Sequence, residues 1–171
     1  RVGAMTDKAE ALKTLLIRNF DTVPLEHRTR TASVDFRHAR LTEGTAASKL
    51  GAAVLVVAPS KIACPYHLHH AQEEMFVILE GSGTLRVAGE HVPIGAGDVI
   101  TVPPGPDYPR QIINTSDAPL KYLAISTQDD PEIYEYPDSG KFMAEAGLFR
   151  EHPFEVIQRS RESLDYWDGE P

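Results

Sequence analysis

Cysteine is almost absent from this chain of 171 residues, in which Cys64 stands alone. A lone cysteine excludes an internal disulfide framework and fits a reducing compartment, so we expect a cytoplasmic protein. Positive charge is also scarce, with 17 lysines and arginines against 25 acidic residues and a net charge of −8. Nucleic acids and anionic membrane surfaces bind basic surfaces, so we expect neither as a partner.

Long apolar runs are missing as well. The longest, residues 52–58, is far shorter than the roughly 20 apolar residues that span a bilayer, and no membrane-spanning segment is predicted. The chain nevertheless has 42% hydrophobic residues and the length of one domain, which is enough for a proper core.

Short apolar segments separated by glycine-rich turns make up the middle of the chain. Residues 52–58 and 75–79 are apolar at consecutive positions, which indicates strands covered on both faces. Further strands are expected at residues 33–36, 84–87, 99–102, 110–113 and 120–126. Many short strands at this spacing are typical of an all-β sandwich or barrel. Residues 6–17 have the cap and apolar stripe of a helix, and the acidic, proline-rich chain after Thr127 is expected to be irregular.

Two histidines and a glutamate form the most informative motif. His67 and His69 lie two apart, so on a strand both side chains point to the same face. Glu74 follows after four residues, and Gly81 after six more. Two imidazoles and a carboxylate that meet from neighbouring strands can hold one divalent metal ion. His67, His69 and Glu74 are therefore the candidate metal ligands.

This spacing resembles the first motif of the cupin superfamily, although Lys61 stands where that motif usually begins with glycine. Gly97, Pro103, Gly105 and Asn114 resemble the second motif. The resemblance implies a jelly-roll barrel, also called a double-stranded β-helix, that usually holds a metal inside. It covers residues 49–127 and predicts three parts: an N-terminal helix and extension (1–48), the barrel core (49–127) and a C-terminal extension packed on the barrel (128–171).

Arg110 occupies the position of the third metal histidine of the family pattern. A guanidinium has only donors and cannot ligate a metal. At an effective dielectric near 20, its charge 4 Å from a dication would meet roughly 8 kcal/mol of repulsion. Three arrangements are open. Arg110 could bind an anionic substrate beside a metal held by the other three residues, pair with Glu74 and replace the metal, or point out of the barrel while Tyr108 or water fills the gap.

The sequence therefore predicts a cupin that binds a small anionic metabolite at a divalent-metal site. The ion is Zn, Fe, Mn or Ni, or absent if Arg110 has displaced it. The resemblance implies a sugar-phosphate isomerase type of enzyme, with Glu74 as catalytic residue and with Arg110 and Tyr108 as substrate-binding residues. Whether the chain is an enzyme is left open. The alternatives are a non-catalytic ligand-binding cupin with a degenerate metal site and a non-haem metal dioxygenase. The two doubly apolar strands need cover, so a homodimer is expected.

Overall fold

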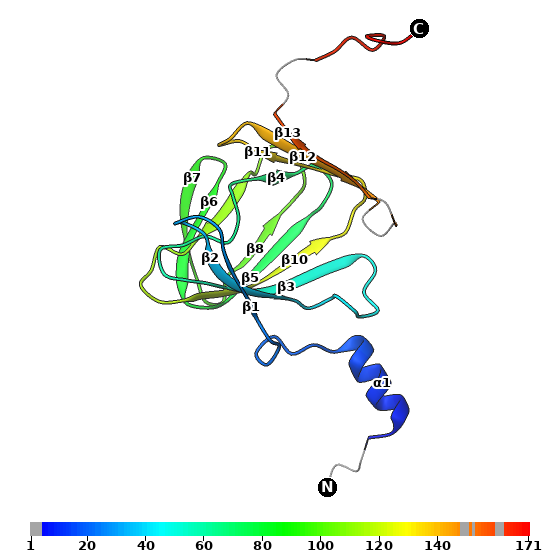
Figure 1. The fold of residues 1–171 in the computed structure, drawn as a ribbon. Helices are drawn as coiled ribbons and strands as arrows, with labels where there is room; N and C mark the ends of the chain where they lie inside the picture. The colour runs from blue at the N-terminus through cyan, green and yellow to red at the C-terminus, as the bar shows by residue number, and fades with distance from the viewer. Residues whose placement is uncertain (1–4, 148–150, 152, 160–162) are drawn as a thin grey trace.

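The computed structural model describes residues 5–147, 151, 153–159 and 163–171 and shows three antiparallel sheets (Figure 1). The largest has the order β1 (Glu26–Thr29), β2 (Asp35–Arg40), β3 (Leu50–Val57), β10 (Leu120–Thr127), β5 (Glu74–Glu80) and β8 (Val99–Val102). The second consists of β7 (Glu90–Gly95), β6 (Ser82–Val87) and β9 (Arg110–Ile113). The third consists of β13 (Phe154–Gln158), β12 (Lys141–Ala146), β11 (Glu132–Tyr136) and β4 (Leu68–His69).

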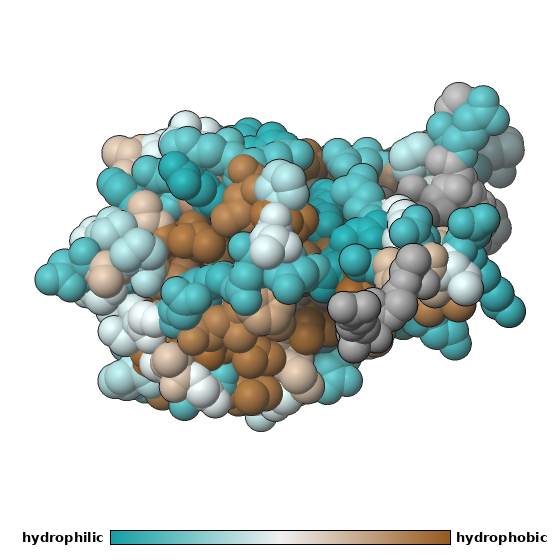
Figure 2. Space-filling view, turned by 90° about the horizontal axis from the view of Figure 1, so that it is seen from below, coloured by the Kyte–Doolittle hydropathy of each residue, from teal (hydrophilic) through white to brown (hydrophobic). Residues whose placement is uncertain are grey.

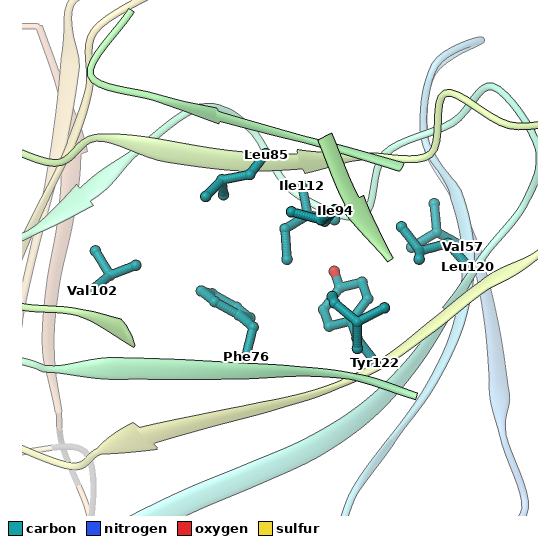
Figure 3. Packing of buried hydrophobic residues seen from close by; sticks show 9 residues of the cluster. Val57, Phe76, Leu85, Ile94, Val102, Ile112, Leu120 and Tyr122 are labelled. Atoms are coloured by element: carbon teal, nitrogen blue, oxygen red, sulfur yellow. The ribbon is translucent and has the colours of Figure 1, made fainter. Parts of the chain in front are cut away.

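The core lies between the six-stranded and the three-stranded sheets (Figure 3). Phe76, Ile78 and Tyr122 point inward from β5 and β10, and Leu85 and Ile112 face them from β6 and β9. All five side chains are buried, so each sheet covers the inner face of the other. This open jelly-roll confirms the all-β fold that the short strands predict.

The outer face of the six-stranded sheet carries an apolar row. In register across five strands lie Ala39, Val54, Leu123, Val77 and Val99. Val99 is 59% exposed, whereas Val54 is fully buried. Figure 2, seen from the side of the molecule that is lowest in Figure 1, shows hydrophobic residues gathered on this side. A second copy of the chain would cover such a row, and the homodimer stays a prediction.

The N-terminal helix forms as expected. Helix α1 (Asp7–Leu16) begins after Thr6, whose hydroxyl accepts the backbone N–H of Ala9 at 3.2 Å, and Ile17 is its C-cap. None of its residues is buried, and Leu12, Leu15 and Leu16 are exposed. Among the described residues no helix is long and apolar enough to cross a membrane.

The C-terminal extension is more regular than the sequence predicts. The prediction of an irregular segment is wrong for Glu132–Tyr136, Lys141–Ala146 and Phe154–Gln158, which form β11, β12 and β13. Strand β11 pairs with β4, so the extension joins the barrel through the strand that carries His69. Asp138, in the turn after β11, is held by the two terminal nitrogens of Arg86 on β6 at 2.7 and 2.8 Å. These contacts link the turn after β11 to the three-stranded sheet.

Candidate metal centre

Backbone pairing places the first histidine beside the arginine. The N–H of Arg110 donates to the carbonyl oxygen of His67 at 2.8 Å, and the N–H of His67 donates back to Arg110 at 3.2 Å. The two residues thus form a directly opposed antiparallel pair, whose side chains share one face of the sheet. His69 follows two residues later on the same face, and its carbonyl accepts the N–H of Gly105 at 2.7 Å.

The three predicted metal ligands meet in the structure. Glu74 begins β5, which belongs to the opposite sheet, and its carboxylate reaches the imidazoles. One ligand atom from each of His67, His69 and Glu74 lies within 4.8 Å of the other two. Nε2 of His69 is 3.6 Å from Oε1 of Glu74. Two neutral nitrogen donors and one carboxylate oxygen form a donor set that suits Zn, Fe, Mn or Ni.

Arg110 points into this cluster. Its side chain is only 2% exposed, and its Nε donates to Oε2 of Glu74 at 2.8 Å. Nη2 donates to the same oxygen. Nη1 has no hydrogen-bond acceptor among the described residues. This burial excludes the arrangement in which Arg110 points out of the barrel, and leaves the other two.

Both imidazoles have the properties that a metal ligand needs. Nδ1 of His67 lies 2.8 Å from the carbonyl oxygen of Pro65, which only accepts, so Nδ1 carries the proton and the Nε2 lone pair is free. Burial, helped by the charge of Arg110, lowers the pKa of His67. Burial is also the main cause that lowers the pKa of His69 to about 3. Neutral imidazole is the form that ligates a metal, so these residues fit a divalent ion.

The lowered pKa of His69 predicts a pH-dependent stability of the metal-free protein. The unfolded chain binds this proton below about pH 6.5 whereas the folded chain does not, so stability is greatest above that pH and falls as pH decreases towards about 3. Between pH 7.5 and 5.0 we expect a loss of about 2 kcal/mol from His69. Urea denaturation in EDTA at both pH values measures it.

His69→Gln should lose that part of the pH dependence, because it removes the group that titrates. His70→Gln is the matched control, since His70 is exposed and pairs with Glu135 at 2.6 Å. An unchanged pH dependence in His69→Gln would contradict the prediction.

The residues next to the motif lie where strand alternation puts them. Glu73 is exposed, as expected for the acidic residue that points away from Glu74, and His70 also faces outward. Tyr108 is 47% exposed in the loop before β9, and its role in substrate binding stays a prediction. Cys64 lies near Glu74 and Arg110, and burial raises the pKa of its thiol to about 12.

Strand β11 also contributes to the candidate site, which the sequence motifs do not predict. The ring of Tyr134 lies 4.5 Å from the ring of His69 in an edge-on arrangement, and the ring of Tyr136 lies 6.1 Å from that of His67. Glu132, on the same face of the strand, has Oε2 3.5 Å from Nδ1 of His69. The only signal for these residues was their spacing at every second position of one segment.

Residues 53–126 match the sequence profile of the cupin domain. These residues form a cupin domain. An uncharacterised protein of Methanocaldococcus jannaschii is 37% identical over 73 residues, which are 40% of this chain and 57% of that protein. The chain thus spans somewhat more than half the length of this curated relative.

Two solved structures resemble nearly the whole chain. A candidate sugar phosphate isomerase of Acidithiobacillus ferrooxidans has a TM-score of 0.72 and 24% identity, and the match covers 88% of this chain and 99% of that one. A cupin-superfamily sugar phosphate isomerase of Silicibacter pomeroyi has a TM-score of 0.71 and 20% identity, and the match covers 88% and 96%. At these identities the likeness shows the fold alone.

Proposed function

We propose that this cupin holds a divalent metal ion with His67, His69 and Glu74 and binds a small anionic metabolite beside it through Arg110. The proposal depends on the buried guanidinium of Arg110, which lies next to the three candidate ligands. Its Nε and Nη2 donate to Glu74, and its Nη1, which has no acceptor among the described residues, is free to donate to a ligand. A carboxylate or phosphate oxygen is the acceptor that suits such a nitrogen.

The charges around the cluster support an ion together with an anionic ligand. Arg110 brings one positive charge, Glu74 and Glu132 bring two negative charges, and both imidazoles are neutral. These five residues are therefore net negative by one charge without an ion, and a dication makes them net positive by one. Glu145, which is buried and accepts the hydroxyl of Tyr134, adds one negative charge on the next strand, β12. A buried site with uncompensated positive charge attracts an anion.

The proposed reaction is an isomerase-type proton transfer on a sugar phosphate or a similar carbonyl compound. A bound divalent ion would supply Lewis-acid polarisation of the substrate carbonyl. Oε2 of Glu74 accepts two hydrogen bonds from Arg110, and Oε1 faces Nε2 of His69, so Glu74 would move the proton with the same oxygen that it offers to the ion. The two similar solved structures are described as sugar phosphate isomerases, which agrees with a sugar phosphate as the substrate class.

A second candidate function is metal-free binding of an anion. The Arg110–Glu74 ion pair favours it, because the guanidinium takes one oxygen of the only carboxylate in the candidate ligand set. The donor set also suits ferrous iron, as the dioxygenase alternative requires, but no contact in the site favours oxygen chemistry over the other two functions.

Metal content tests the proposal. The parent protein, purified without a nickel column, is expected to contain near-stoichiometric metal by mass spectrometry. His67→Ala should lower the affinity for the metal by more than ~100-fold, because even an outer partner of a ligand contributes 10–100-fold. His70→Ala should keep it, since His70 is exposed.

Arg110→His separates the two candidate functions. An empty parent with a metal-filled Arg110→His variant would show that the arginine has displaced the ion, and the metal-free function would replace the proposal. Metal in the parent, together with tighter binding of inorganic phosphate to the loaded than to the metal-free protein, supports the metal-dependent function.

A further inference from the structure

Glu132 is a fully buried carboxylate that the C-terminal extension places behind the metal centre. Its side chain is 1% exposed, and it opens β11, the strand that pairs with β4. A buried carboxylate is costly unless hydrogen bonds satisfy it. Oε1 accepts the N–H groups of His70 at 2.9 Å, Ala71 at 3.0 Å and Ile133 at 2.7 Å, and Oε2 accepts that of Gln72 at 2.6 Å.

These contacts fix the loop that joins two candidate metal ligands. Residues 70–72 connect His69 at the end of β4 with the segment that leads to Glu74 at the start of β5. Because one carboxylate accepts three successive backbone N–H groups of this loop, it sets the separation between the two strand ends.

The same carboxylate faces the metal ligand itself. Nδ1 of His69 is buried and has no hydrogen-bond partner among the described residues, and Oε2 of Glu132 lies 3.5 Å from it. The opposite ring nitrogen, Nε2, faces Oε1 of Glu74 at 3.6 Å. A carboxylate behind one imidazole nitrogen favours a proton there and leaves the lone pair of the other nitrogen for a metal.

We infer that Glu132 is a positioning residue, which holds His69 with the proton on Nδ1 and with Nε2 turned towards the metal site. Pro65 does the same for His67, through its carbonyl oxygen 2.8 Å from Nδ1. Both histidines then present Nε2 to one point. The cupin domain thus obtains part of its metal centre from a strand outside the segment that the family profile matches, residues 53–126. The inference rests on the proposed metal site.

Nitrogen-15 NMR of the histidine rings tests the inference in the metal-free protein. In the parent, His69 is expected in the Nδ1–H form. In Glu132→Gln the negative charge is lost, and we expect a mixture of both tautomers. Isothermal titration with Zn²⁺ should show a 10–100-fold loss of affinity in the same variant.

Gln72→Ala is the matched control. Gln72 is buried in the same loop, and its side chain donates to the carbonyl oxygen of Asp129 at 3.2 Å and has no hydrogen bond to His69 among the described residues. This variant should lose thermal stability but keep the His69 tautomer and the Zn²⁺ affinity within about threefold of the parent. If Glu132 had only a structural role, both variants would lose thermal stability and keep the His69 tautomer and the Zn²⁺ affinity.

Two results overturn the inference. One is the Nε2–H form of His69 in the parent, which is decisive even if Glu132→Gln does not fold. The other is an unchanged tautomer and affinity in Glu132→Gln. If the parent binds no Zn²⁺ while its His69 is in the Nδ1–H form and changes in Glu132→Gln, the proposed metal function fails and the positioning role stands.

Discussion

Glu74→Gln is expected to lower the free energy of unfolding of the metal-free protein by about 3–5 kcal/mol. The substitution keeps the shape of the side chain but removes its charge. Arg110, only 2% exposed, would then hold a buried positive charge whose direct partner is neutral. Urea denaturation in EDTA at pH 7.5 measures the loss.

A double-mutant cycle shows whether this loss belongs to the ion pair. Glu74→Gln with Arg110→Met should recover most of the stability, because an apolar side chain of similar length removes the uncompensated charge. Arg86→Gln is the control: its pair with Asp138 has bidentate geometry, but the two side chains are 27% and 56% exposed. It should cost less than about 1 kcal/mol. Additive losses at Glu74 and Arg110 would contradict the prediction.

That His67, His69 and Glu74 lie together could be predicted from the sequence, because local rules decide it. Strand alternation puts His67 and His69 on one face, and the short loop before β5 brings Glu74 back to them. The direction of Arg110 depends on something else. Its guanidinium turns inward because Glu74, from another strand, offers it an oxygen, and the sequence alone did not show whether that oxygen was free.

The role of β11 could not be predicted for a different reason. Its sequence, EIYEY, puts Glu132, Tyr134 and Tyr136 on one face and Ile133 and Glu135 on the other, so neither face has the uniform apolar period that marks a half-buried strand. The segment pairs at all five residues with β12, the other strand of its hairpin, and it also pairs with β4 through Tyr134 and His69, which lie far apart along the chain. Tertiary pairing of this kind overrides local propensity, and Glu132 gains its function only through it.

Asn114, the last residue of the second cupin motif, is expected to matter for stability more than for chemistry. It is fully buried, and its Nδ2 lies 3.0, 3.1 and 2.8 Å from the carbonyl oxygens of Val57, Ala58 and Ala118. Its Oδ1 accepts the N–H and the hydroxyl of Ser116. The amide therefore ties the end of β3 to the turn between β9 and β10.

Asn114→Asp should destabilise the protein by about 4 kcal/mol or more at pH 8, because it removes the donor and turns a carboxylate oxygen towards three carbonyl oxygens. The folded state would keep this carboxyl protonated, so the folded chain binds more protons than the unfolded one. The difference from the parent should shrink as pH falls to 5.

Asn19→Asp is the matched control. It makes the same chemical change at a residue whose side-chain oxygen accepts hydrogen bonds and whose side-chain nitrogen donates none among the described residues. Asn19 is exposed, and its Oδ1 accepts the N–H groups of Asp21 and Thr22. A carboxylate serves equally well there, so stability should change by less than about 0.5 kcal/mol. Urea denaturation of both variants and the parent between pH 5 and 8 measures the contrast. Two results would contradict the prediction: Asn114→Asp is as stable as Asn19→Asp, or it becomes less stable relative to the parent as pH falls. Either would show that the Asn114 amide does not hold β3 and the turn after β9 together by donating to their carbonyl oxygens.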